Sequence, residues 1–179
     1  MPYPIIALVG PSGSGKTMLI DAVVTALPEQ VARIKSIVTR PPRNAEDHLM
    51  YDFVTPEEFD ALDQAGDVLE RLAYAGHWYG VRQSHLHQVL GQGYGIAALI
   101  EDGVRYFQKL GYPLIVIRVR PLGDTRPNDP SRSEIDVERE QQILPVDVVI
   151  ENSFAAGGKA KAISDTLGYI QQRMNYART

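Results

Sequence analysis

Apolar runs alternate along the chain with segments in which apolar residues recur at helical spacing. The runs that predict strands are 4–9, 34–38, 95–100, 113–119 and 146–150. The helical patterns between and after them cover 15–27, 56–64, 82–90, 102–110 and 155–174. The pieces 96–100 and 114–117 are apolar throughout, as in strands that are covered on both faces. This alternation predicts an α/β fold in which helices flank a parallel sheet of five strands.

Two stretches interrupt the alternation. Residues 39–81 contain short extended pieces and one short helix, which begins with the capping-box sequence Thr55-Pro56-Glu57-Glu58. Residues 121–139 open with three prolines and a glycine within ten residues, which is typical of a loop, and a helical pattern follows at 135–142. We therefore expect one domain over residues 1–179, with 39–81 as an inserted subdomain and 121–139 as a short lid.

A phosphate loop of the form G-x-x-x-x-G-K-T joins the first predicted strand to the first predicted helix, the context in which this motif forms a P-loop nucleotide site. Its glycines let backbone N–H groups turn toward phosphate oxygens, and the helix N-terminus favours anions. Lys16 is expected to reach the β- and γ-phosphates of ATP, and the Thr17 hydroxyl to hold Mg²⁺. The residues expected to bind ATP here are Gly10, Ser12, Gly13, Ser14, Gly15, Lys16 and Thr17. The alternative, an ordinary glycine turn, does not account for the strand and helix on either side.

Composition narrows the class of protein. Of the 179 residues 44% are hydrophobic, and no apolar run approaches the ~20 residues of a membrane span. The chain has no cysteine, which excludes disulfides and suits a reducing cytoplasm. The net charge is −4 and no basic run occurs, so we expect neither nucleic acid nor a membrane as a partner. Nothing in the sequence indicates the oligomeric state.

A second candidate anion site follows the second predicted strand. The segment Ser36-Ile37-Val38-Thr39-Arg40-Pro41-Pro42-Arg43 places two arginines three residues apart on a proline-stiffened turn. A guanidinium group donates in a planar fork and stays charged, so a pair of them suits a phosphate group. The alternative is a solvated basic turn. A phosphate loop alone also fits GTPases, motors and transporters, whereas two anion sites favour a kinase of a phosphorylated small molecule.

Five motifs in order resemble those of the guanylate kinases, a family of P-loop nucleoside monophosphate kinases. Residues 36–43 match the family's S-x-x-T-R-x-P-R, and residues 51–59 are similar to its Y-x-F-V-S-x-x-E-F. Residues 66–70 are similar to G-E-F-L-E, residues 76–80 to G-N-Y-Y-G, and residues 149–152 to V-I-x-N. The resemblance is close over residues 5–82 and looser from 83 to 179.

The resemblance implies a role for each matching residue. Those that would hold the phosphate of the acceptor monophosphate are Ser36, Arg40, Arg43, Tyr51 and Tyr79. Glu70 would accept hydrogen bonds from guanine N1–H and the 2-amino group, and Asn152 would lie near the adenine of ATP. Catalysis would then rest on positioning and charge stabilisation by Lys16 and the arginines. Taken singly, the two tyrosines also fit core aromatics, and Glu70 fits a surface carboxylate at a strand end.

Three features depart from the family's pattern. Val81 stands where the family has a Ser or Thr that meets guanine O6, and valine cannot donate a hydrogen bond. The segment 99–103 reads L-I-E-D-G where the family has D-x-D-x-Q-G, so Glu101 or Asp102 would have to replace its acids. The prolines of 121–131 oppose the arginine-bearing helix of the family's lid. The cations left for the lid are Arg126, Arg132 and Arg139, of which Arg139 is the best placed for catalysis.

These observations support three hypotheses. The leading one is a cytoplasmic, ATP-dependent kinase that transfers the γ-phosphoryl group to a nucleoside monophosphate, with GMP or dGMP as the first acceptor to test. Val81 and the altered acidic segment keep open a second, in which the acceptor is a modified nucleotide or ribose 1,5-bisphosphate. The third is a non-catalytic binding module of the same fold, against which the intact phosphate loop argues.

Overall fold

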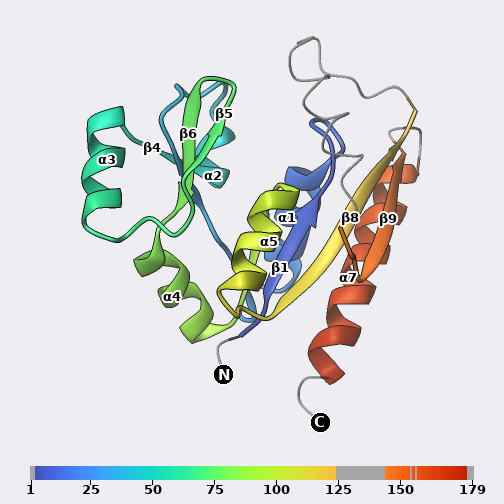
Figure 1. Cartoon of the computed structure of the whole chain (residues 1–179). Helices are drawn as coiled ribbons and strands as arrows, with labels where there is room; N and C mark the ends of the chain where they lie inside the picture. The colour runs from blue at the N-terminus through green and yellow to red at the C-terminus, as the bar shows by residue number, and fades with distance from the viewer. Residues whose placement is uncertain (1–2, 124–143, 154, 156, 177–179) are drawn as a thin grey trace.

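The computed structural model describes residues 3–123, 144–153, 155 and 157–176, and it contains two sheets (Figure 1). In the larger sheet the strand order is β2-β7-β1-β8-β9, and all four neighbouring pairs are parallel. The prediction of an α/β fold with a five-stranded parallel sheet is thus confirmed. The five strands are β1 (Ile5–Val9), β2 (Val31–Arg33), β7 (Tyr94–Ala98), β8 (Leu114–Leu122) and β9 (Val148–Ser153).

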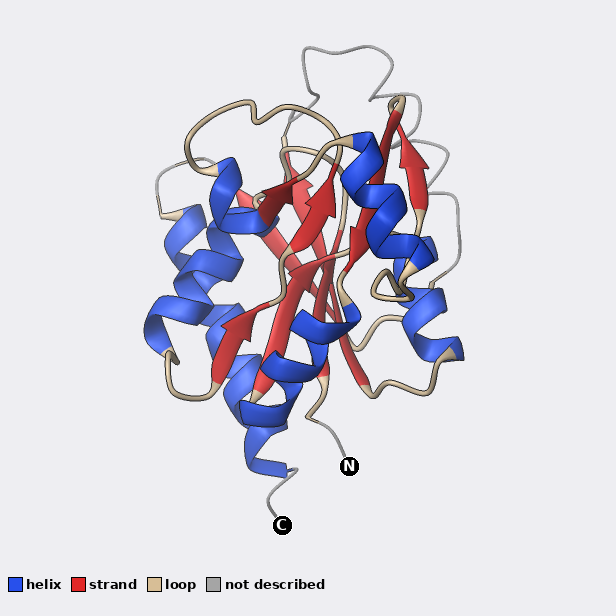
Figure 2. Cartoon of the chain, turned by 90° about the vertical axis from the view of Figure 1, so that its left-hand side faces the viewer, coloured by secondary structure: helices blue, strands red, loops and turns tan. Residues whose placement is uncertain are grey.

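The larger sheet is covered by helices on both faces (Figure 2). Helices α1 (Lys16–Ala26) and α7 (Gly158–Tyr176) pack on the face that receives Ile6 and Leu8. Helices α4 (Gln83–Gln92) and α5 (Glu101–Lys109) pack on the opposite face. Because successive strand residues point to opposite faces, β1 has to be apolar throughout, and all five of its residues are buried.

The smaller sheet is built from residues 36–81 and has the strand order β4-β3-β6-β5. Its strands β3 (Ser36–Val38), β4 (Tyr51–Phe53), β5 (Leu72–Tyr74) and β6 (His77–Val81) are accompanied by α2 (Asp47–Met50) and α3 (Pro56–Gln64). The predicted capping box starts α3: the Thr55 hydroxyl accepts from Glu58 N at 3.1 Å, and the Glu58 carboxylate accepts from Thr55 N at 2.7 Å. This unit lies to one side of the carboxyl ends of the larger sheet's strands (Figure 1).

The predicted single strand at 34–38 is wrong. The chain instead forms β2 at the edge of the larger sheet, and it enters the smaller sheet as β3. Ile34 and Lys35 connect the two, and their N–H groups donate to Ile96 O at 2.9 Å and to His85 Nε2 at 3.2 Å. Apolar and polar residues are mixed throughout residues 31–38, so hydrophobicity alone does not mark the change of sheet.

Strand β8 runs further than predicted and includes the first two residues of the expected lid. Pro121 and Leu122 pair with Asn152 and Ser153 of β9. A proline is tolerated here because β1 ends opposite Arg118, so that beyond this point no described strand pairs with the other edge of β8. Residues 124–139 of the predicted lid, with Arg126, Arg132 and Arg139, lie outside the described residues.

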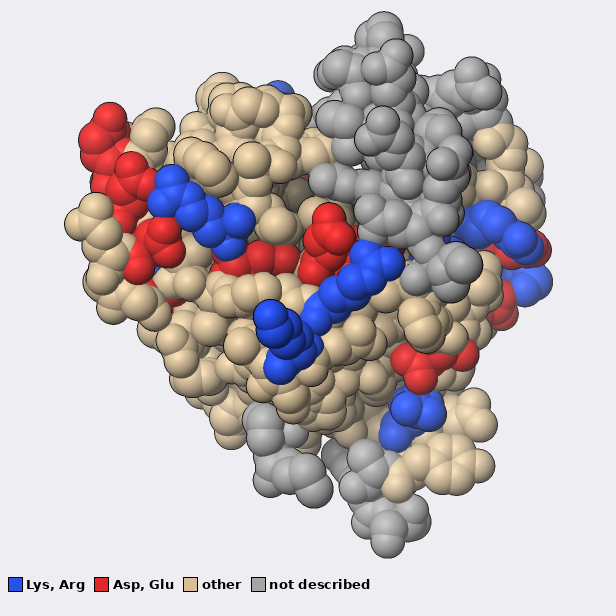
Figure 3. Space-filling model, in the orientation of Figure 1, with Lys and Arg blue, Asp and Glu red and all other residues tan. Residues whose placement is uncertain are grey.

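The described part of the chain has no helix with the length and apolar character that crossing a membrane requires. On the face seen in Figure 3, acidic and basic side chains are interspersed, and no continuous basic surface is visible there.

Candidate active site

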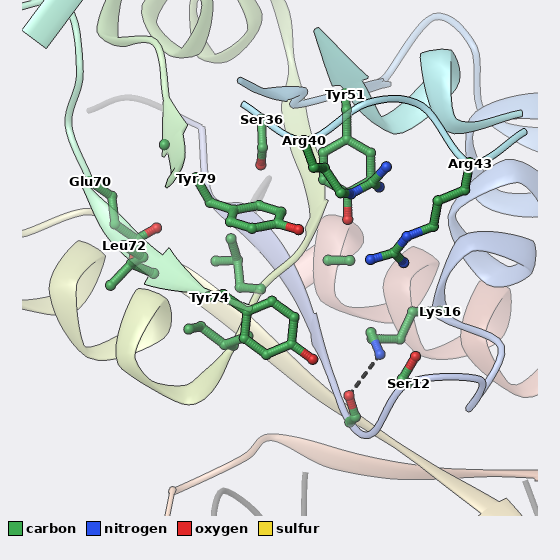
Figure 4. Close-up of a pocket in the computed structure, with 15 residues that line it drawn as sticks. Ser12, Lys16, Ser36, Arg40, Arg43, Tyr51, Glu70, Leu72, Tyr74 and Tyr79 are labelled. Carbon is green, nitrogen blue, oxygen red and sulfur yellow. Dashed lines mark hydrogen bonds between the residues drawn. The ribbon is translucent and has the colours of Figure 1, made fainter. Parts of the chain in front are cut away.

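The phosphate loop connects β1 to α1 and closes around the Lys16 ammonium group. Lys16 Nζ donates to the carbonyl oxygens of Gly10 and Pro11, each at 2.7 Å. Figure 4 shows one of these bonds as a dashed line. Gly10 has φ 149°, and a Cβ at this position would lie 2.4 Å from Val119 O. Gly15 has φ 97° and caps the N-terminus of α1. The glycines therefore allow both the left-handed backbone and the close approach to β8 that give the loop its curvature.

Asn152 at the end of β9 supports the loop from below. Its side chain is fully buried, and Nδ2 donates to the Ser14 carbonyl oxygen at 2.8 Å. A Cβ on Gly15 would lie 2.2 Å from the same nitrogen, so glycine is needed for this contact. In the structure the Asn152 side chain holds the phosphate loop in place, and its position near the donor adenine stays a prediction.

Arg40 and Arg43 leave β3 on the predicted turn and are organised by Asp47, a residue that the sequence reading missed. One Asp47 oxygen accepts from Arg40 Nη1 at 2.7 Å and from the Arg43 backbone N–H at 2.8 Å. Burial alone lowers the pKa of Arg40, but hydrogen bonds to Asp47 and Tyr79 outweigh it and the pKa is raised. Arg40 Nε is buried and has no hydrogen-bond partner among the residues that the structure describes, which leaves it available to an anion.

Three tyrosines form an aromatic chain beside the arginines. The Tyr51 and Tyr79 rings meet edge to face at 6.2 Å, and Tyr74 meets Tyr79 at 5.8 Å. The Arg40 guanidinium lies 4.8 Å from the centre of the Tyr51 ring. Burial, followed by the neighbouring Tyr79, raises the pKa of Tyr51, so its hydroxyl keeps its proton and can donate. The hydroxyls of Tyr51 and Tyr79 point toward the space that the Arg43 side chain enters (Figure 4).

Two cavities meet at these residues. The first, about 190 Å³, runs from the phosphate loop and the arginines to Glu70; it is also lined by Ser36, Leu72, Tyr74, Tyr79, Gly80, Ala98, Leu99 and Ile100. The second, about 550 Å³, lies between α1 and α2 and is lined by Gly13, Gly15, Thr17, Asp21 and Glu46, among others. Lys16, Arg40, Arg43 and Tyr51 line both cavities. A molecule in each would therefore meet the other at the same cations.

Comparison with known proteins identifies the family of this chain. The model of the family described as "Guanylate kinase" matches residues 3–152. The guanylate kinase of Alkalilimnicola ehrlichii is 38% identical over 173 residues, which are 96% of this chain and 78% of that protein. The chain belongs to the guanylate kinase family.

Other relatives are matched over less of their length. The guanylate kinase of Thermosynechococcus vestitus is 39% identical over 63% of this chain and 59% of its own length. That of Pseudomonas fluorescens is 39% identical over 56% of this chain and 49% of its own length. The crystal structure of guanylate kinase from Anaplasma phagocytophilum superposes with a TM-score of 0.69 at 21% identity, over 98% of this chain and 86% of that one, which supports the fold.

Within this family member, Glu70 is the carboxylate that lines the inner end of the first cavity. The side chain is buried, which excludes the reading as a surface carboxylate, and Oε1 has no hydrogen-bond partner. Burial, and then the charge of Asp102, raises the pKa of Glu70 to about 7. A carboxyl group of this kind is prepared for a ligand that donates hydrogen bonds.

The departures from the guanylate kinase pattern have structural explanations. Val81 is buried in the apolar core beside α4 and is not among the residues that line the first cavity, so its assignment to the acceptor site is not supported. Glu101 is buried and faces Arg118 at 3.5 Å, and Asp102 pairs with Arg105 at 3.2 Å. Neither acid lines the cavity; Ala98 and Ile100 do. The segment therefore supplies an apolar wall.

Leu72 and Tyr74 also line the cavity, and the sequence reading did not single them out. A signal was present in the sequence. β5 begins two residues after Glu70, and alternate residues of an extended segment point to the same face. If Glu70 faces the cavity, Leu72 and Tyr74 should face it as well.

Proposed function

We propose that this chain is an ATP-dependent kinase that transfers the γ-phosphoryl group of ATP to the phosphate of GMP or dGMP. The observation that carries the proposal is the junction of the two cavities, where Lys16, Arg40, Arg43 and Tyr51 line both. Phosphoryl transfer needs a donor and an acceptor phosphate in line between positive charges, and this junction provides such a place.

On the donor side, the triphosphate would be held by the backbone N–H groups of the phosphate loop. The Lys16 ammonium, which now donates to Gly10 and Pro11, would turn to the β- and γ-phosphates. Thr17 lies at the start of α1 on the wall of the second cavity and would offer its hydroxyl to Mg²⁺. When bound with ATP, Mg²⁺ would neutralise charge on the β- and γ-phosphate oxygens. The described residues hold no cluster of three metal-ligating side chains, which suits a metal held mainly by phosphates and water.

On the acceptor side, Arg40, Arg43 and the two tyrosines would hold the monophosphate, with Ser36 adding a hydroxyl. The base would extend toward Glu70 between Leu72 and Ile100. Guanine presents two neighbouring donors, N1–H and the 2-amino group, to the two oxygens of one carboxylate. Because the acceptor phosphate is already ionised, the reaction needs no strong general base, and positioning supplies most of the acceleration.

A panel of acceptors with ATP and Mg²⁺, followed by ADP release, tests the proposal. GMP and dGMP should give the highest kcat/KM, and AMP, UMP and CMP should be poor acceptors. Turnover with ribose 1,5-bisphosphate but not with GMP would mean that the protein is a kinase with a different acceptor from the one proposed. Absence of ADP with every acceptor, under conditions where the protein is folded and binds ATP, would refute catalysis.

A further inference from the structure

Glu70 lines the end of the first cavity where the acceptor base would lie, and within the described part of the chain no hydrogen bond or ion pair holds its carboxyl group. Glu70 is 6% exposed, and its Oε1 accepts no hydrogen bond. The side chain lies over the start of α5, where a Cβ on Gly103 would be 2.8 Å from Oε1. Leu72 and Ile100 beside it are apolar. Such surroundings disfavour an isolated carboxylate, so the group can exist in either protonation state near neutral pH.

The charged groups around Glu70 do not fix its protonation state. On α5, Asp102 opposes ionisation, and Tyr106 lies close enough to feel the charge of Glu70. The N-terminus of α5 favours the anion but makes no hydrogen bond to Oε1.

The cations on the neighbouring elements have their own partners. Arg118 on β8 faces Glu101, and Arg71, the next residue along the chain, pairs with Asp60 and Asp63 of α3. Lys16, at the other end of the cavity, donates to the phosphate loop. Among the described residues, no hydrogen bond or ion pair joins a cation to Glu70, so neither protonation state is imposed on it.

The two protonation states complement different base edges. An ionised carboxylate only accepts, so it fits guanine N1–H together with the 2-amino group. A neutral carboxyl accepts with one oxygen and donates with the other, so it fits the N1–H and O6 edge of any 6-oxopurine. Hypoxanthine, the base of IMP, has this second edge but lacks the 2-amino group.

We propose that Glu70 sets the base selectivity of the acceptor site through its protonation state: the ionised form selects guanine by its 2-amino group, and the neutral form accepts guanine and hypoxanthine alike. This inference rests on the proposed function, because it concerns the acceptor of the same reaction. It predicts that selectivity for GMP over IMP increases with pH.

The test is the ratio of kcat/KM for GMP to kcat/KM for IMP, measured with ATP from about pH 5.5 to about pH 9. The ratio cancels effects common to both acceptors, including ionisation of their phosphates. Because kcat/KM reports the free enzyme, the ratio should stay low while Glu70 is protonated and should rise above a pH of about 7, where the ionised form dominates. A rise of about tenfold or more is expected from one lost hydrogen bond to a charged group.

Two variants sharpen this experiment. Glu70→Gln, which offers one acceptor and one donor at every pH, should give a low ratio that does not change with pH. Asp102→Asn removes the opposing charge and should move the midpoint to lower pH, whereas Asp165→Asn, the same change at an exposed ion pair on α7, should not move it. A ratio that stays constant with pH in wild-type enzyme that turns over GMP would overturn the inference. If no turnover of GMP occurs, the proposed function itself fails.

Discussion

The donor and acceptor halves of the site differ in which buried atoms lack a partner. Beneath the phosphate loop, these are the neutral Ser14 Oγ and Asn152 Oδ1, while the Lys16 ammonium is held by two carbonyls. Around the acceptor cavity they belong to groups that can carry charge, Arg40 Nε and Glu70 Oε1. Leaving a charged group unpaired is far less favourable than leaving a neutral one. The charged group of the donor half thus has its hydrogen-bond partners already. The acceptor half is stabilised most when a ligand supplies the partners that Arg40 and Glu70 lack.

Removing the cation of the donor half should produce the largest effect. Lys16→Ala should lower kcat by about 100- to 1,000-fold, because the charge that stabilises the transferring phosphoryl group is lost. The KM for GMP should change little. Steady-state ADP release at saturating ATP measures both constants. A kcat within a factor of three of the wild-type value would mean that the transferring phosphoryl group does not lie beside Lys16.

Glu70 should show its effect in stability as well as in catalysis. The pKa of this buried group is raised to about 7 from an ordinary value of 4.5. The unfolded chain therefore loses the proton at lower pH than the folded protein, and this group makes the free energy of unfolding fall as pH rises from about 4.5 to about 7. Glu70→Gln removes that dependence.

The difference in free energy of unfolding, Glu70→Gln minus wild type, should therefore grow by up to about 3 kcal/mol between about pH 4 and pH 8. Urea unfolding at a series of pH values measures it. A difference that is the same at both ends of the range would mean that Glu70 titrates normally in the folded protein.

Arg43 tests the acceptor half through a residue on its exposed side. Arg43→Ala should raise the KM for GMP and lower kcat, with kcat/KM reduced about 10- to 100-fold, the loss typical of a charged hydrogen bond to phosphate. The KM for ATP should stay nearly unchanged. Arg173→Ala, at an exposed ion pair on α7, is the matched control and should leave all constants intact. If the KM for ATP rises as much as that for GMP, Arg43 serves the donor.

Asn152 should give the smallest effect, confined to the donor half. Asn152→Ala removes the hydrogen bond to Ser14 O and leaves space beneath Gly15, so the free energy of unfolding should fall by about 1–2 kcal/mol and the KM for ATP should rise. The KM for GMP should not change. Thr166→Val deletes another buried polar group, in α7, and shows whether lower stability alone weakens ATP binding. Equal effects on both KM values would remove the distinction between the halves.

The two halves also differed in how far the sequence could predict them. The phosphate loop could be predicted because eight consecutive residues carry its glycines, its lysine and its threonine. The larger sheet could be predicted because continuous apolar runs are typical of strands that are buried on both faces. The passage from β2 to β3 could not be predicted, since the mixed apolar and polar residues of 31–38 mark no boundary between the two sheets.

The acceptor pocket depends on contacts between distant segments. Asp47 contacts both arginines from a short helix, α2, which the hydrophobic periodicity of the sequence does not predict. Leu72, Ala98 and Ile100 line one cavity only because the fold brings β5 close to the end of β7. Asn152 is identifiable as a family motif residue, but its burial beneath the loop depends on the register of β8 and β9. Pairings of this kind are set by tertiary packing, which sequence spacing does not encode.

Transfer of label from [γ-³²P]ATP to GMP tests the central claim most directly. With wild-type protein, ATP, Mg²⁺ and GMP, the account predicts labelled GDP as the product, little labelled inorganic phosphate, and transfer that depends on Lys16 and Arg43. Label that appears only as inorganic phosphate, at a rate independent of GMP, would contradict it, because the two cavities would then not hold donor and acceptor phosphates together.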